Sequence, residues 1–187
     1  MTTENWKHFV LITFSGLIIC MLIGFILAGY NAILPGHLAF QFTFYGLFCS
    51  LLYAVLRFSS TRDFIFVAII FYLFDAILLG HGNPAKFVIH GIYSLFIAGS
   101  IYIYAKKIEQ DIKNQFLSNI LSLSGLVAFA FLFTVLVLTM FPKYKFDYSF
   151  LEGQVFMGLL IGLGLGVGFH VYYWYQSKIK KLNKKKA

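Results

Sequence analysis

Charge is scarce in this sequence. Charged residues make up 12% of its 187 residues, and the seven Asp and Glu are outnumbered by 15 Lys and Arg. Hydrophobic residues make up 60% of the chain. A chain with this balance is too apolar to hide its hydrophobic residues in a water-soluble core, so its composition places it in a lipid bilayer.

Cysteine and proline are also scarce, with two and three residues. Two cysteines cannot build a disulfide framework, and Cys20 and Cys49 are expected to act as small hydrophobic residues, with a redox pair as the alternative. Pro35, Pro84 and Pro142 each lie between two apolar runs, where proline stops a helix. Because they fall in every second loop, they predict three consecutive helical hairpins.

Familiar catalytic motifs are missing as well. The sequence holds no G-x-S-x-G nucleophile motif, no Walker phosphate loop and no H-E-x-x-H zinc motif. The sequence therefore favours a non-enzymatic role, and it identifies no cofactor.

What the sequence does contain is six apolar runs. A helix needs about 20 apolar residues to cross the hydrocarbon core of a bilayer. The runs cover residues 9–28, 38–56, 64–79, 87–105, 117–140 and 155–174. They predict an all-α integral membrane protein, with six transmembrane helices in one compact bundle over residues 1–176 and a basic tail at 177–187.

The basic residues predict the orientation. With the N-terminus in the cytoplasm, 12 of the 15 Lys and Arg lie on the cytoplasmic side, and Lys86, Lys143 and Lys145 lie outside. This asymmetry predicts that both termini are cytoplasmic. The expected location is a bacterial inner membrane, or the ER membrane in a eukaryote, where the ending KKKA resembles a dilysine retrieval signal.

The net charge of +8 comes largely from the tail and the cytoplasmic loops. With no soluble domain to present a groove, nucleic acid is not an expected partner. Anionic lipid headgroups are expected to contact the tail lysines instead. These are Lys178, Lys180, Lys181, Lys184, Lys185 and Lys186.

Glycines recur in the sixth run at a spacing of four. They are Gly158, Gly162, Gly164, Gly166 and Gly168. Small residues at this spacing let two helices approach closely in lipid. We therefore expect this run to pack tightly against a neighbouring helix, either in the same chain or in a membrane protein partner.

Asp75 is the ionisable residue that most needs an explanation. It lies in the run 64–79, roughly 7 Å inside the outward end at about 1.5 Å per residue. A carboxylate at the centre of a membrane helix costs about 2.5–3.5 kcal/mol, and less toward the interface. Asp75 should therefore face the bundle interior, as a functional group or in a structural hydrogen bond to a nearby Tyr or Ser.

Other polar residues are predicted on the same outward side as Asp75. They are His37, Gln41, His90, Ser94 and Glu152. His37 and Gln41 share a helical face through their i,i+4 spacing, as do His90 and Ser94. Together with Asp75, these residues predict a substrate-binding cavity open to the exterior.

Histidine also raises two cofactor hypotheses. His37, His81 and His90 are candidate metal ligands, because imidazole suits zinc, iron or nickel, but their spacing matches no metal motif. The other hypothesis is a haem held by His37 and His90, or by His8 and His170. His8, His37 and His90 lie at the ends of their runs, which does not favour haem inside the hydrocarbon.

Three functional hypotheses follow. The first is a membrane protein that binds or transports a small solute through an outward-facing polar cavity. The second is a membrane enzyme acting on a lipid or isoprenoid substrate, with Asp75 and a histidine as acid and base. The third is an assembly or scaffold subunit that docks a partner through the glycines of the sixth run.

Overall fold

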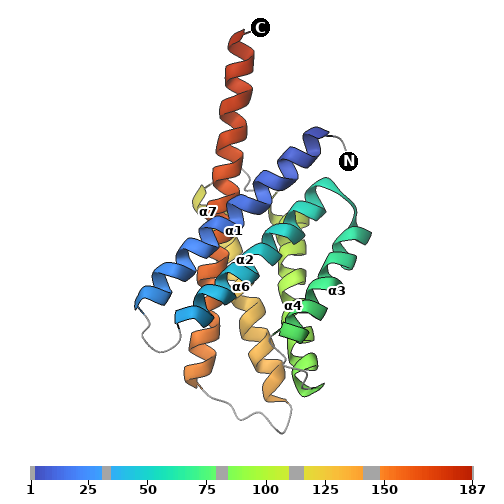
Figure 1. Ribbon diagram of the computed structural model, residues 1–187, viewed down its shortest axis with the longest axis vertical. Helices are drawn as coiled ribbons and strands as arrows, with labels where there is room; N and C mark the ends of the chain where they lie inside the picture. The colour runs from blue at the N-terminus through green and yellow to red at the C-terminus, as the bar shows by residue number, and fades with distance from the viewer. Residues whose placement is uncertain (1–2, 31–34, 79–83, 110–115, 141–147, 187) are drawn as a thin grey trace.

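The computed structural model describes residues 3–30, 35–78, 84–109, 116–140 and 148–186, and nearly all of them are helical (Figure 1). The elements are α1 (Thr3–Tyr30), α2 (Pro35–Phe58), α3 (Thr61–Leu78), α4 (Pro84–Ile103), a π-helical turn η1 (Tyr104–Ile108), α6 (Phe116–Thr139) and α7 (Tyr148–Lys186). The predicted all-α fold class is therefore confirmed.

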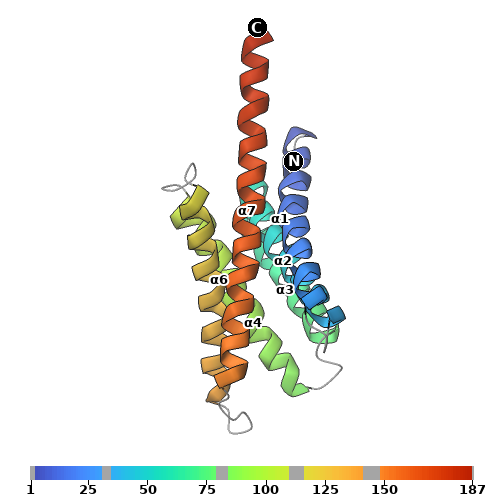
Figure 2. The same ribbon diagram turned by 90° about the vertical axis from the view of Figure 1, so that its left-hand side faces the viewer.

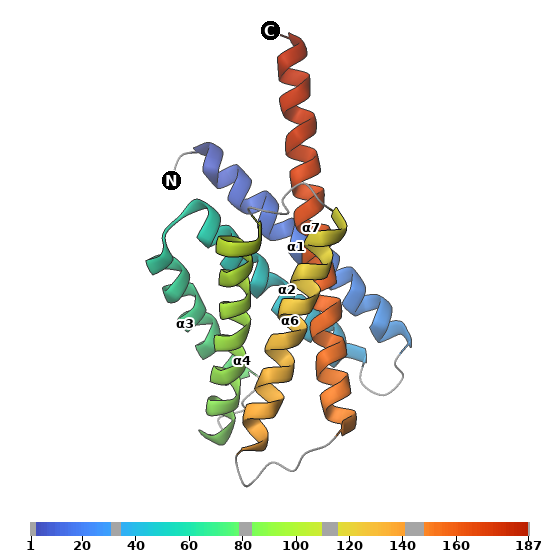
Figure 3. The same ribbon diagram turned by 180° about the vertical axis from the view of Figure 1, so that it is seen from behind.

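The helices run up and down along the bundle. Both termini lie at one end, together with the α2–α3 connection at residues 59–60, and α2, α4 and α7 begin at the other end (Figures 1 and 3). We call the first the terminal end and the second the far end. Both proline residues that the structure describes, Pro35 and Pro84, are the first residues of their helices. The first N–H of a helix has no intrahelical acceptor, so a proline at that position costs no hydrogen bond.

Four helices within the described residues are long and apolar enough to cross a membrane. The segments are Thr3–Gly29, Ala39–Phe58, Phe116–Thr139 and Leu151–Ile179. The structure thus supports a membrane protein. The 18 residues of α3 include three charged ones, Arg62, Asp63 and Asp75, which set it apart from these four.

The last helix is longer than predicted. α7 extends from Tyr148 to Lys186, so the residues predicted as a separate tail at 177–187 continue the helix as far as Lys186. Lysine is a good helix former, so a lysine-rich segment can extend a helix that is already nucleated. This part of α7 projects beyond the rest of the bundle (Figure 2).

α3 begins with an N-cap at Ser60, which is not part of the sequence-based predictions. The Oγ of Ser60 accepts a hydrogen bond from the backbone N–H of Asp63 at 3.2 Å and donates one to the Oδ2 of Asp63 at 2.8 Å. Hydrogen bonds from Ser59 and Ser60 lower the pKa of Asp63 below its usual value. Asp63 therefore remains ionised in the first turn of α3, where negative charge is favourable.

α7 packs between α6 and α1 through its glycines. On one side, a Cβ added to Gly158, Gly162 or Gly166 would lie 2.8, 2.5 or 2.7 Å from the nearest backbone atom of α6. On the other side, a Cβ at Gly164 would lie 2.8 Å from the Sγ of Cys20, and one at Gly168 would lie 2.7 Å from the Cα of Gly16. Both contacts need glycine, since real Cβ atoms do not approach other atoms so closely.

Aromatic rings pack α2 against two neighbouring helices. Tyr53 of α2 stacks on Phe169 of α7 with ring centroids 4.2 Å apart, and Phe48 of α2 stacks on Phe71 of α3 at 3.6 Å. Cys20 and Cys49 are fully buried and not disulfide-bonded. These contacts join α2 to α3 and to α7 in one apolar core.

Replacing Gly162 with alanine should destabilise the bundle. Its methyl group would be forced against the backbone of Leu123 and Ser124, and overpacking of this kind typically costs about 1–3 kcal/mol. The matched control is Gly125→Ala on α6, where no atom lies within 4 Å of an added Cβ. Unfolding in mixed detergent micelles should show a lower free energy of unfolding for Gly162→Ala and an unchanged or higher one for Gly125→Ala. Equal losses in both variants would contradict this packing.

Candidate functional site

Two of the acidic residues described by the structure are buried. Asp75 is 0% exposed and Glu109 is 2% exposed, whereas Glu4 and Glu152 are exposed. Buried carboxylates are rare unless they are hydrogen-bonded or paired, because removing their charge from water is unfavourable. Both residues therefore need polar partners.

Asp75 lies near the far end of the bundle, among tyrosines from two other helices. Tyr45 of α2 and Tyr93 of α4 are both close enough to Asp75 to interact with it electrostatically. The hydroxyl of Tyr93 donates a hydrogen bond to the Oε1 of Gln154 on α7 at 3.1 Å. These four residues, which we call the Asp75 cluster, come from four different helices.

The predicted binding residues are only partly gathered around this cluster. Ser94 is buried beside Tyr93 in the sequence, and Gln41 is partly buried one helical turn before Tyr45. Glu152, by contrast, is exposed near the start of α7. From α7 it is Gln154, two residues further along, that joins the cluster.

The predicted histidines fall mostly outside the described residues. His37 and His90 lie within α2 and α4, but their side chains are not among those described, and His81 lies in the undescribed segment between α3 and α4. Within the described ranges, no group of three or more His, Cys, Asp or Glu residues is placed to hold a metal ion. The metal hypothesis for these three histidines is therefore not tested.

His8 and His170, the second predicted haem pair, have other neighbours. The Nδ1 of His8 lies 2.7 Å from the Nε2 of Gln176, and its ring stacks on Phe58. The ring of His170 packs against Phe116, with the centroids 4.5 Å apart. The Nδ1 of His170 is buried without a hydrogen-bond partner among the described residues, so the haem hypothesis for this pair is not tested.

Glu109 lies toward the terminal end and is held by groups from two other helices. The hydroxyl of Tyr173 on α7 donates a hydrogen bond to its Oε1 at 2.5 Å, and the Nη2 of Arg57 on α2 lies 3.9 Å from the same oxygen. Tyr53 of α2 is hydrogen-bonded in turn to Tyr173. We call these four residues the Glu109 cluster.

A π-helical turn positions Glu109. The backbone N–H of Glu109 bonds to the carbonyl of Tyr104, five residues earlier, instead of four as in an α-helix. The wider turn is of a kind often found at functional sites. The side chain of Tyr104 donates a hydrogen bond to the Oδ1 of Asn119 on α6 at 2.8 Å, so the same turn is also tied to α6.

Sequence reasoning missed the Glu109 cluster. Glu109 lies beyond the end of the predicted run 87–105, in the segment KKIEQDIK, which resembles an ordinary polar loop. Two signals were available. The first is that Tyr53 and Arg57 are spaced i,i+4 at the end of an apolar run. The second is that Glu109 is an acid on the predicted cytoplasmic side of the membrane, where basic residues predominate.

One of the lysines predicted to meet lipid headgroups has a described side chain. The Nζ of Lys178 lies 4.9 Å from the ring centroid of Trp174, which is 56% exposed. An exposed tryptophan beside a lysine is typical of a helix at a membrane interface. The side chains of the other five, Lys180, Lys181, Lys184, Lys185 and Lys186, are outside the described set.

Comparisons with known proteins do not add a family. No protein-family model, no curated protein and no solved structure matches this chain.

The two clusters differ in their chemistry. In the Glu109 cluster, the carboxylate lies near an arginine and accepts a hydrogen bond from a tyrosine, and these contacts tie helices to one another. The described members of the Asp75 cluster are a carboxylate, two phenols and an amide from four helices. These groups can hydrogen-bond to a polar solute, so the Asp75 cluster is the better candidate for a binding site.

Removing the Tyr173 hydroxyl should weaken the terminal end of the bundle. Tyr173→Phe removes a hydrogen bond to a buried carboxylate, and such charge-assisted bonds contribute about 1.5–3 kcal/mol. Tyr175→Phe is the matched control, because Tyr175 is on the same helix and is 46% exposed. The free energy of unfolding in micelles should fall for Tyr173→Phe and remain within about 0.5 kcal/mol of the parent for Tyr175→Phe. The Glu109 cluster would be refuted if the two variants were equally stable.

Proposed function

We propose that this chain is a six-span membrane protein that binds and transports a small polar solute through the Asp75 cluster. The observation that carries the proposal is the position of Asp75, a fully buried carboxylate inside the bundle, with hydrogen-bonding side chains of the same cluster on three other helices. Intramembrane acids of this kind are characteristic of substrate and ion pathways.

The six-span arrangement is supported by the packing of α3 and α4. They pack against each other, α3 also contacts α2, and α4 also contacts α2 and α6, so both lie within the bundle formed with the four membrane-length helices. The 18 residues of α3 are about 27 Å long at 1.5 Å per residue, close to the roughly 30 Å of a hydrocarbon core. Asp63 and Arg62 then lie at its interfacial end.

The excess of basic residues at the terminal end supports a cytoplasmic location for that end. The far end, with the Asp75 cluster, then faces the exterior of a bacterial inner membrane, or the lumen if the membrane is the ER. A solute would reach Asp75 from that side.

The choice of solute follows from the charges. A carboxylate that loses its water on burial is stabilised by a cation, by hydrogen-bond donors or by protonation. Tyr45, Tyr93 and Gln154 can orient hydroxyl or amino groups beside it. We therefore propose a small polar solute, and a positive charge on it would complement Asp75.

The other two hypotheses have less support. All five glycines proposed for partner docking already contact α6 or α1 of the same chain, so a scaffold role would need another surface. An acid–base enzyme would need a histidine beside Asp75, and the side chains of His37 and His90 are outside the described set.

The orientation can be tested with single cysteines. Cys20 and Cys49 are both 0% exposed, so they should react slowly with a membrane-impermeant maleimide. Met140 is 80% exposed near the far end, and Ser60 is exposed at the terminal end. In intact cells, Met140→Cys should be labelled directly, whereas Ser60→Cys should be labelled after the membrane is permeabilised. The reverse pattern would place both termini outside.

Solute binding can be tested by Asp75→Asn. This change keeps the shape of the side chain and removes its charge, so the fold should survive while binding is lost. In a thermal-unfolding screen of small polar amines and alcohols, a solute at 100 times its Kd should stabilise the parent protein by about 2.7 kcal/mol. Each such solute should fail to stabilise Asp75→Asn and should enter proteoliposomes that carry the parent protein.

The control for this screen is Asp63→Asn, because Asp63 is an acid on the same helix that is engaged with Ser59 and Ser60 at the terminal end. It should respond to the solutes as the parent protein does. Equal stabilisation of the parent and of Asp75→Asn by every active solute would rule out Asp75 as the binding group.

A further inference from the structure

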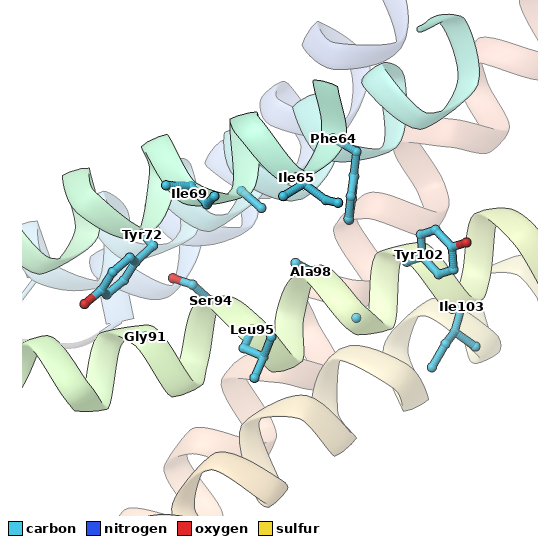
Figure 4. Close-up of a pocket in the computed structure, with 12 residues that line it drawn as sticks. Phe64, Ile65, Ile69, Tyr72, Gly91, Ser94, Leu95, Ala98, Tyr102 and Ile103 are labelled. Atoms are coloured by element: carbon cyan, nitrogen blue, oxygen red, sulfur yellow. The ribbon is translucent and has the colours of Figure 1, made fainter. Parts of the chain in front are cut away.

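An open groove runs between α3 and α4, on helices that also hold Asp75 and Tyr93. Its volume is about 690 Å³, within the range of about 300–1,000 Å³ that is usual for ligand sites. Figure 4 shows Phe64, Ile65 and Ile69 of α3 on one side, opposite Leu95, Ala98 and Tyr102 of α4. The lining is almost entirely apolar, so its occupant must also be apolar along its length.

The ring of Tyr72 narrows the groove at one end, and the groove is open along its middle. Toward the far end, the ring of Tyr72 covers Gly91 so closely that an added Cβ would lie 3.2 Å from the Cε2 of Tyr72. At Gly99, two helical turns further along α4, no atom lies within 4 Å of an added Cβ. A chain in the groove could therefore lie along Gly99 and would end against Tyr72.

The length of the groove matches one leaflet of a bilayer. Its lining on α4 extends from Gly91 to Ile103, which is about 18 Å at 1.5 Å per residue. Half of a hydrocarbon core of about 30 Å is about 15 Å. The groove is thus long enough for one acyl chain and too short for a second helix that spans the whole membrane.

The mouth at the terminal end is basic. Phe64 and Tyr102, with ring centroids 5.9 Å apart, mark this end of the groove. Arg62 lies two residues before Phe64, and Lys106 and Lys107 lie about one turn beyond Tyr102, all three of them exposed. Asp63, an acid at this end of α3, is engaged with the hydroxyls of Ser59 and Ser60.

We propose that this groove binds an anionic phospholipid. One acyl chain lies between α3 and α4 along Gly99, and the phosphate lies at the mouth near Arg62, Lys106 and Lys107. Basic residues beside a gap between membrane helices are suited to anionic headgroups. This site differs from the polybasic end of α7, because it selects a lipid by its chain as well as its charge. It depends on the chain lying in a bilayer and not on solute binding at Asp75.

Spin-labelled lipid provides the test. The full-length protein is reconstituted in phosphatidylcholine vesicles that contain a small fraction of phosphatidylglycerol with a spin label on one acyl chain. Electron paramagnetic resonance then measures the motionally restricted fraction of that lipid. We expect restriction of phosphatidylglycerol beyond that of spin-labelled phosphatidylcholine, and this excess should be lost in Gly99→Leu, whose side chain fills the groove.

Two further variants make the result specific. Gly125→Leu places the same side chain in open space on α6, and it should retain the excess restriction of phosphatidylglycerol. The double change Lys106→Gln and Lys107→Gln keeps the groove but removes charge, so it should weaken the preference for phosphatidylglycerol by about fivefold per lysine.

Three outcomes would overturn the proposal. The first is excess restriction in Gly99→Leu equal to that of the parent protein. The second is equal restriction of both lipids by the parent protein, which would mean that the surface holds lipid without selecting charge. The third is chemical cross-linking that shows a dimer in the parent protein and in Gly125→Leu but not in Gly99→Leu, because the occupant would then be a second copy of the chain.

Discussion

The close approach of α7 to α6 and α1 is the constraint on which the other contacts depend. Glycines spaced by four, such as Gly158 and Gly162, meet the backbone of α6, and those offset by two, such as Gly164, meet α1 on the opposite side. Two residues correspond to about 200° around a helix, so one helix can present two bare faces. α7 therefore lies between α6 and α1, and the side chains beyond both ends of its glycine stretch are fixed in position.

Those side chains link the two clusters. Gln154, before the glycines, bonds to Tyr93 in the Asp75 cluster, and Tyr173, after them, bonds to Glu109. The clusters differ in their groups. Arg57 lies beside Glu109 near the terminal end, whereas the described members of the Asp75 cluster are a carboxylate, two phenols and an amide, which fit the proposed solute site. The groove between α3 and α4 is lined by the helices that carry Asp75 and Tyr93, so the proposed lipid and solute sites share two helices.

The sequence was most informative about features that depend on local pattern. Apolar runs and prolines located all six helices to within a few residues at most ends, and the spacing of Gly158, Gly162 and Gly166 predicted a helix-packing face. It was less informative about features that depend on tertiary contacts. The π-turn that orients Glu109 has no sequence signature, and the pairing of Glu109 with Tyr173 joins residues 64 positions apart. The sequence predicts Glu152 at the site from its charge, whereas the residue that bonds to Tyr93 is Gln154, and the direction of a side chain is not visible in a sequence.

The most direct test of this account is carboxyl footprinting of the full-length protein in micelles with a water-soluble carbodiimide and an amine, read by mass spectrometry. The exposed Glu4 and Glu152 should be modified quickly, and Asp75 and Glu109 should be protected. In Gly162→Leu, which forces α7 away from α6, Asp75 and Glu109 should become reactive together. Modification of Asp75 and Glu109 in the parent protein as fast as that of Glu152 would contradict the account.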